Sequence, residues 1–372
     1  MGETEMRRII FPALVVMFTA VTLYAQVQLP TSSIRGNVGV FIEPQIDTSR
    51  LDPYREVINQ YPGTLQAAEA QLAIGMVYYD GRAYSGSMRE FKKVLGDYPV
   101  FPVTDDAEYY IARSHSKLHQ DSLAIEEARK VVTLYPNSEW VDESLNLIGW
   151  SRYIQERYAD AIAEFRNIMD HYPACKYRDD AWMMIGKSYK RLGRYDDAIN
   201  AFSKPITDFP PSNHQNEAQL EIGVIRMKVA QYDTAMVELQ KVIDLYPSLK
   251  GKSKAQYEIA SIWFIKGDKR RAAAEFQKII DLYPNEQVAS YAAFRVGYCL
   301  MGLKEYESAI KQFEKTEESY KDFSQKDWLL YFTGKCLHEL GRTQEGNTYL
   351  QRLISEYKGS SLVTAAKRLL GM

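Results

Sequence analysis

The sequence predicts an all-α fold, a solenoid of about eight stacked helix-turn-helix units of 37 residues with half-repeats at both ends. Three observations predict it: an aromatic-Pro pair that recurs every 37 residues, a Gly or Ala fourteen residues after each aromatic residue, and apolar residues at helical spacing. The pairs are Tyr61-Pro62, Tyr98-Pro99, Tyr135-Pro136, Tyr172-Pro173, Phe209-Pro210, Tyr246-Pro247 and Tyr283-Pro284, and the frame continues at Tyr320 and Tyr357, where Lys replaces Pro.

Each unit is predicted to contain two helices, with positions counted from the aromatic residue as zero. Apolar residues at positions 9, 13 and 17 indicate helix A from about position 5 to 20, and those at 26, 30 and 33 or 34 indicate helix B from about 23 to 35. Gly or Ala at position 14 and Ala at position 26 leave room for close helix packing. Gly193, Gly267 and Gly341 stand at position 21, where a chain leaving a helix favours Gly.

The same frame predicts where the helices and the array end. Tyr-Pro should end helix B, because a residue before Pro is pushed out of the α region. Ser138, Ser212 and Ser360, at position 3, are candidate N-caps for the next helix A, and Pro205 should distort the last turns of one helix B. Asp52 to Tyr61 and Ser360 to Gly371 are predicted to form a lone helix B and a lone helix A that cover the two apolar ends.

The N-terminal 50 residues are predicted to lie outside the array. Residues 1–25 resemble a secretory signal peptide, with Arg7 and Arg8 before an apolar stretch and Ala25 suited to cleavage; the alternative is an uncleaved membrane anchor. No Cys lies near this segment, so we expect no lipid anchor of the bacterial lipoprotein kind. Residues 26–50 are expected to form a loose linker or an extended arm, and residues 51–372 the solenoid.

Composition and motifs give no support for nucleic-acid binding or catalysis. The net charge of −2, with both signs mixed along the chain, disfavours nucleic acid as the main partner. Gly186-Lys187-Ser188 and Gly251-Lys252-Ser253 lack the first Gly of a phosphate loop. The pair His115 and His119 is expected to be solvated near a helix end. At least one of the three Cys must be unpaired, and Cys299 and Cys336, at the same position of adjacent units, are expected to be core residues too far apart for a disulfide. We therefore expect no enzyme activity, cofactor or metal.

One stretch carries the pattern of a known repeat family. The run from Ala181 to Gly186, followed by Tyr195, Ala198, Phe202 and Pro210, resembles the tetratricopeptide repeat. The longer period with Tyr-Pro-x-Ser is similar to two bacterial envelope families, the repeat domain of the periplasmic coordinator associated with the Tol–Pal system and the repeat lipoprotein of the outer-membrane β-barrel assembly machine. The chain departs from them in lacking a preceding coiled coil and a lipidation Cys. The resemblance implies a right-handed superhelix.

The resemblance further implies a concave groove lined mainly by helix A, at positions that correspond to 8, 11, 15 and 18. Position 8 is acidic in the early units, at Glu69, Asp106, Glu143, Asp180 and Glu217. In the late units these positions are aromatic or apolar, at Tyr257, Phe264, Tyr291, Phe294, Tyr298, Met301, Trp328 and Tyr331. These eight residues are the candidate partner site, because aromatic side chains dominate binding hot spots. The alternative is that some of them belong to the core between units.

These observations lead to one expected function and two alternatives. The chain is expected to be an exported, non-enzymatic scaffold or adaptor that binds segments of envelope proteins in its groove. It is expected in the periplasm, associated with the outer membrane, and to contact a membrane only through a partner complex or an uncleaved N-terminal segment. The first alternative is a structural subunit of an outer-membrane assembly or secretion complex. The second is an accessory to a cell-wall glycan enzyme.

Overall fold

The computed structural model describes residues 44–372, which contain 18 α-helices and no strand. The predicted signal peptide and residues 26–43 of the predicted arm lie outside the described residues. The described end of the arm has no regular structure up to Asp47, and a short 3-10 helix, η1 (Thr48–Leu51), follows. The side chain of Ile46 lies against Gly81, in the turn between the first two helices of the array.

Eight complete units follow one another through the described chain, as the 37-residue period predicts. Helix A of successive units is α3 (Leu65–Asp80), α5 (Thr104–Lys117), α7 (Val141–Ile154), α9 (Arg178–Arg191), α11 (Gln215–Lys228), α13 (Leu249–Ile265), α15 (Gln287–Gly302) and α17 (Lys326–Glu339). Helix B is α4 (Tyr84–Asp97), α6 (Asp121–Leu134), α8 (Tyr158–His171), α10 (Tyr195–Thr207), α12 (Tyr232–Leu245), α14 (Lys269–Leu282), α16 (Tyr306–Ser319) and α18 (Thr343–Glu356). The predicted half-repeats are α2 (Asp52–Gln60) and α19 (Val363–Leu369).

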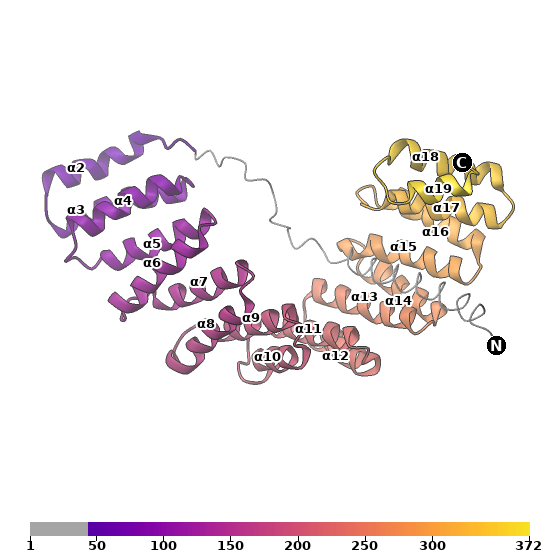
Figure 1. Cartoon of the computed structure of the whole chain (residues 1–372), viewed down its shortest axis with the longest axis horizontal. Coiled ribbons are helices and arrows are strands. Elements are labelled where there is room, and N and C mark those ends of the chain that lie inside the picture. Colours follow the sequence, from indigo (N-terminus) through magenta and orange to yellow (C-terminus); the bar gives the residue numbers. More distant parts are fainter. Residues whose placement is uncertain (1–43) are drawn as a thin grey trace.

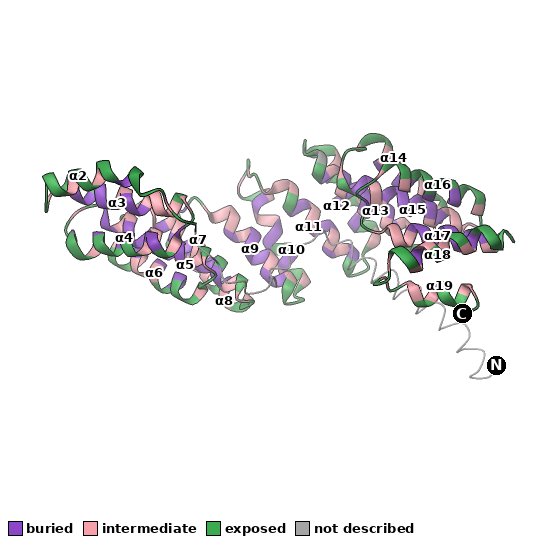
Figure 2. Cartoon of the chain, turned by 90° about the horizontal axis from the view of Figure 1, so that it is seen from above, coloured by how far each residue is buried: buried purple, intermediate pink, exposed green. Residues whose placement is uncertain are grey.

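The helices stack into an open arc (Figure 1). In its middle, α7, α9 and α11 lie on the inner side of the arc, and α8, α10 and α12 lie on the outer side. Figure 2 views the same array from above and shows buried residues running from helix to helix along its whole length. Each unit packs on its two neighbours, so the core is continuous although no part of it is thick.

Close packing of the two helices within a unit depends on position 14. A Cβ added to Gly75, Gly149 or Gly297 would lie 2.4 to 2.6 Å from the ring at position 30 of the same unit. The rings are those of Phe91, Phe165 and Phe313, respectively, all fully buried. The small residue and the large ring are therefore complementary halves of one contact, as the sequence pattern predicts.

Position 21 has a left-handed backbone in every complete unit. Gly193, Gly267 and Gly341 have φ of 73°, 84° and 76°, and the other units hold the same turn without Gly. The non-Gly residues, with φ between 57° and 63°, are Arg82, His119, Glu156, Ala230 and Lys304. The packing of helices A and B thus sets the turn geometry. Gly lowers the strain of the left-handed backbone at this position but is not required for it.

Two predicted details differ from the structure. Ser138, Ser212 and Ser360 do not occupy the N-cap; each Oγ accepts a hydrogen bond from the amide two residues later, within the turn that leads into helix A. Pro205 lies inside α10, and the helix continues through it to Thr207. Cys299 and Cys336 are buried and unpaired, as predicted, and Cys175 is buried and unpaired as well. In the described part of the chain, the helices are too short or too polar to span a membrane.

Candidate functional site

In the middle of the arc, the inner side is formed by helix A of each unit (Figure 1). Among helix A residues, Trp150 is 40% accessible, and Ile154 and Ile265, at position 19, are also exposed. Large apolar side chains at such exposure are available to a partner without rearrangement of the core.

The late units carry a group of packed rings that we call the C-terminal aromatic cluster, consisting of Tyr291, Phe294, Tyr298, Phe323, Trp328 and Phe332. The Phe294 ring lies at its centre, with its centroid 5.7 Å from Phe313 and 5.9 Å from Phe332. The Tyr298 ring stands edge-on to Phe332 at 5.1 Å. The Tyr291 hydroxyl lies 3.0 Å from the Ser324 hydroxyl of the next unit. The cluster therefore spans α15, α17 and the turn between their units.

The eight predicted groove residues divide into two groups. Tyr257 is 5% accessible and Phe294 is 1% accessible, so both are core residues that a partner cannot reach in this conformation. The other six are half-buried and keep part of their surface on the solvent side: Phe264, Tyr291, Tyr298, Met301, Trp328 and Tyr331. Burial thus settles the choice between core and groove for two residues, and the other six remain candidates.

The acidic residues predicted in the early groove connect one unit to the next. The Trp140 Nε1–H donates to Asp106 at 2.8 Å, and the Lys176 ammonium donates to Glu143 at 2.6 Å. Glu217 pairs with Lys187 at 2.9 Å. Each contact reaches between adjacent units, so these carboxylates stabilise the stacking of units as well as lining the face.

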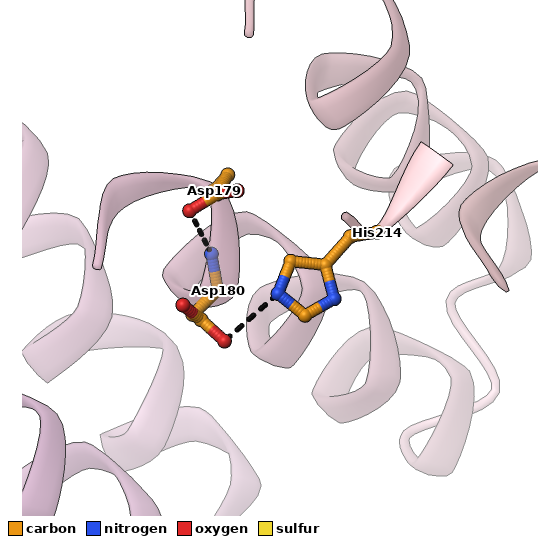
Figure 3. A group of neighbouring side chains, drawn as sticks. All are labelled: Asp179, Asp180 and His214. Atoms are coloured by element: carbon orange, nitrogen blue, oxygen red, sulfur yellow. Dashed lines mark hydrogen bonds and ion pairs between the residues drawn. The ribbon is translucent and has the colours of Figure 1, made fainter. Parts of the chain in front are cut away.

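Asp179, Asp180 and His214 form a compact group at the entry to α9 and α11 (Figure 3). Each offers one ligand atom of a kind that binds metals, and these atoms lie within 4.8 Å of one another. The Asp180 carboxylate lies 2.8 Å from His214 Nε2 and raises the pKa of His214, mainly through this hydrogen bond. The Ser212 hydroxyl donates to Asp179 at 2.9 Å, and Ser360 makes the equivalent bond to Asp327. The contacts of this group therefore link two adjacent units.

Sequence reasoning missed a second aromatic group, which we call the N-terminal aromatic cluster: Tyr79, Tyr109, Tyr110 and Trp140, gathered around Arg113. The Tyr109 and Trp140 rings stack with centroids 4.3 Å apart, and the Arg113 guanidinium lies 5.7 Å from the Tyr79 centroid. Burial raises the pKa of Tyr79 and of Tyr109 to about 12. Tyr79 and Tyr109 occupy positions 18 and 11, so the frame used for the late units could have found them.

Two minor motifs are placed by the structure. Gly186-Lys187-Ser188 lies inside α9, where Gly186 packs against Phe202, so this segment is a helix interior and not a phosphate loop. The prediction of a solvated His pair is wrong for His115, which is buried with its Nδ1 2.6 Å from Gln120 Oε1. His119 occupies the left-handed position 21 of the same unit.

Charged side chains follow one another at position 12 of helix A in three consecutive units. Glu221 on α11 pairs with Lys190 on α9 at 2.6 Å. Glu258 on α13 and Arg295 on α15 hold the same position in the next two units. Burial raises the pKa of Glu258 to about 7, against the opposing effect of Arg295. Position 12 therefore carries charge from α11 to α15, next to the aromatic residues of the late units.

Comparisons with known proteins agree with this architecture. Residues 52–203 match the YfiO family of outer membrane lipoproteins, and residues 217–248, 266–322 and 330–360 match tetratricopeptide repeat families. The C-terminal part of a TPR repeat-containing protein from Cytophaga hutchinsonii is similar in structure, with a TM-score of 0.53 and 16% identity over 66% of this chain and 93% of that one.

Two further solved structures match the chain at lower similarity. A tetratricopeptide repeat protein from Parabacteroides merdae is 15% identical over 76% of this chain and 99% of its own, with a TM-score of 0.46. The MamA protein is 22% identical over 49% of this chain and 93% of its own, with a TM-score of 0.40. A search of curated proteins found no significant match. At 16% identity, the Cytophaga hutchinsonii structure is evidence for the fold alone.

Proposed function

The chain is a tetratricopeptide repeat protein whose residues 52–203 are similar to outer membrane lipoproteins, and from this premise we propose that it is an exported, non-enzymatic scaffold of the cell envelope. It holds segments of other envelope proteins along the inner face of its arc. The periplasm is the proposed location, and the similarity to outer membrane lipoproteins supports this.

One observation carries the binding proposal: six aromatic or apolar side chains on helices α13, α15 and α17 are only half-buried and keep part of their surface exposed. A ring fixed by its neighbours loses little side-chain entropy when a partner covers it, so each ring contributes strongly to binding. The rings are fixed, since Phe264 lies 5.7 Å from Tyr298 and Tyr298 lies 5.1 Å from Phe332. The surface is therefore preorganised for an extended or helical segment.

Photo-crosslinking in the native envelope tests this proposal. A photoreactive residue is placed at Ile265, on the inner face, and in a matched strain at Val237, which is on the outer helix α12 and similarly exposed. We expect discrete protein adducts from position 265 and few from position 237, because only the inner face is proposed to bind. Equal adducts from the two positions, or none from position 265, would refute groove binding.

Substitution of the rings gives a second, independent test. Replacing Tyr291, Tyr298 and Trp328 together by polar residues should abolish the adducts formed at position 265. Because these side chains also pack on the core, the variant must first show an unchanged far-UV circular dichroism spectrum. A folded variant that still forms the same adducts would contradict the role of the rings.

The YfiO similarity favours one alternative, a structural subunit of an outer-membrane assembly complex that binds through the edges and ends of its N-terminal half. Crosslinks separate the two proposals by position. A subunit would form stoichiometric adducts from the outer surface of α4 to α8, whereas a scaffold would form them from the inner face of α13 to α17.

A further inference from the structure

Asp179, Asp180 and His214 are side chains of metal-binding types that the stacking of two units brings together. The two Asp residues lie in the first turn of α9, and His214 reaches Asp180 from the start of α11 (Figure 3). One ligand atom of each residue lies within 4.8 Å of the others. A Zn²⁺ ion with bonds of about 2.1 Å holds tetrahedral ligand atoms roughly 3.4 Å apart, so small side-chain rotations would complete a site. The expectation of no metal rested on motifs within short stretches, whereas this group spans two units.

The contact between units does not itself require His at position 5. Three consecutive units have acids at positions 7 and 8, and position 5 of the unit that follows each is Trp140, Tyr177 and His214 in turn. The Trp140 indole donates to Asp106 at 2.8 Å, and His214 makes the equivalent contact with Asp180 at 2.8 Å. An indole N–H therefore serves the structural contact, whereas an imidazole can also offer a nitrogen lone pair to a metal ion.

Ser212 holds two of the three candidate ligands in place. Its hydroxyl donates to the Asp179 carboxylate at 2.9 Å and accepts the backbone N–H of His214 at 3.0 Å. The other Asp179 oxygen accepts the backbone N–H of Asp180 at 3.0 Å. Hydrogen bonds of this kind orient metal ligands, and each carboxylate oxygen keeps a lone pair for an ion.

The charge around the His214 ring favours a cation. The Asp180 carboxylate raises the pKa of the ring, mainly by accepting its hydrogen bond, and Asp179 and Glu217 add to this effect. Lys187 pairs with Glu217, so the two Asp residues carry the charge that a bound ion would neutralise. The His214 and Asp180 side chains are 26% and 38% accessible, so an ion reaches them from solvent without unfolding of the chain.

We propose that Asp179, Asp180 and His214 bind one Zn²⁺ ion, with water completing its coordination, and that the ion fixes the angle between the two units in the middle of the arc. Binding releases the Nε2 proton of His214 to solvent and replaces the contact between ring and carboxylate by two bonds to the metal. Because the ligands come from both units, the ion resists their separation. The proposal does not depend on groove binding.

Titration of the chelator-treated full chain with Zn²⁺, followed by isothermal titration calorimetry, tests the proposal. The wild-type chain should bind one Zn²⁺ ion more than His214→Trp, which keeps an N–H donor of the kind that Trp140 supplies. Asp180→Asn should lose the same site. Ser212→Ala should weaken it by about tenfold or more, because the orienting hydrogen bonds are lost. Amide hydrogen exchange in α9 to α11 should become slower with Zn²⁺ in the wild-type chain and not in His214→Trp.

Trp140→His is the reciprocal variant. It places an imidazole beside Asp105 and Asp106, the equivalent acids of an earlier unit, and should create a second Zn²⁺ site between α5 and α7. Far-UV circular dichroism checks folding, and Asp180→Asn and Trp140→His decide the question if His214→Trp does not fold. A wild-type chain that binds no more Zn²⁺ than Asp180→Asn would show that the group is a structural contact only. Binding of Zn²⁺ without slower exchange in α9 to α11 would overturn the proposed effect on the angle between units.

Discussion

The N-terminal and C-terminal aromatic clusters share positions 11 and 12 of helix A but are built differently. The first is made of Tyr and Trp around Arg113, which is half exposed and lies over the rings of Tyr79 and Tyr109. The second is rich in Phe, and its neighbouring Arg295 is buried. The comparison teaches that a repeat frame fixes where rings gather, whereas the residue types decide how deeply the neighbouring cation is buried.

Removal of the central ring of each cluster should have the largest effect and should distinguish them. Phe294→Ala leaves a void bounded by Phe313 and Phe332, and we expect a loss of about 3–5 kcal/mol in unfolding free energy. Tyr109→Ala should cost less, because half-buried Trp140, which stacks on it, can move into the space. Urea unfolding followed by circular dichroism gives the two values.

Amide hydrogen exchange shows which helices each substitution destabilises. Since each unit touches only its neighbours, faster exchange should be confined to α13–α18 for Phe294→Ala and to α3–α8 for Tyr109→Ala. Equal destabilisation by the two changes, or exchange that spreads over the whole array, would contradict the difference drawn between the clusters.

The fold could be predicted from the sequence because its determinants are local. Pro after Tyr, Gly opposite Phe91 and the turn at position 21 act within one unit, so a single unit repeated along the chain specifies the array. The site could be predicted only in part. Phe294 and Trp150 occupy positions 11 and 15 of helix A, yet one is in the core and the other is exposed, because burial there depends on the side chains of the adjacent unit.

Stability against pH should differ between units that pair Gln with Glu across helices A and B and a unit that pairs two Glu. Between helices A and B, Gln71 donates to Glu90 at 3.1 Å and Gln256 donates to Glu275 at 2.6 Å, but one N-terminal unit has buried Glu108 facing Glu127 instead. Burial first, and then Glu127, raises the pKa of Glu108 from 4.5 to about 7. The folded chain therefore holds a proton that the unfolded chain releases. The stabilisation is complete below about pH 4.5 and is lost as the pH rises through about 7.

Replacing Glu by Gln in one unit and Gln by Glu in another tests this difference. Glu108→Gln should remove a pH-dependent loss of about 1–3 kcal/mol between pH 4.5 and 7, measured by urea unfolding at several pH values. Gln256→Glu should install a similar loss in the C-terminal half, because it creates the same facing carboxyl groups. A pH profile that neither substitution alters would show that the carboxyl pair does not control stability.

Substitution by Ala should have opposite effects at two Gly residues, one at crowded position 14 in the C-terminal half and one at an open site in the N-terminal half. Gly297→Ala places a Cβ 2.5 Å from the Phe313 ring, and we expect a loss of about 1–3 kcal/mol from overpacking. Gly96→Ala, in α4, meets nothing within 4 Å and should stabilise the chain by up to about 1 kcal/mol through helix propensity. Thermal unfolding of both variants checks the sign. Destabilisation by both would mean that backbone effects, and not the ring, set the cost.

The smallest expected effect lies at the turns between the clusters, where position 21 is left-handed in both Ala230 and Gly267. Ala230→Gly should stabilise the chain by about 0.5–1 kcal/mol, because relief of the strained φ exceeds the entropy that Gly adds to the unfolded state. Gly267→Ala should destabilise it by a similar amount. The matched pair is measured by urea unfolding, and hydrogen exchange should report the change in α11 to α14. If both changes act in the same direction, the turn is not held in the left-handed region by packing, and the repeat geometry depends on the residue itself.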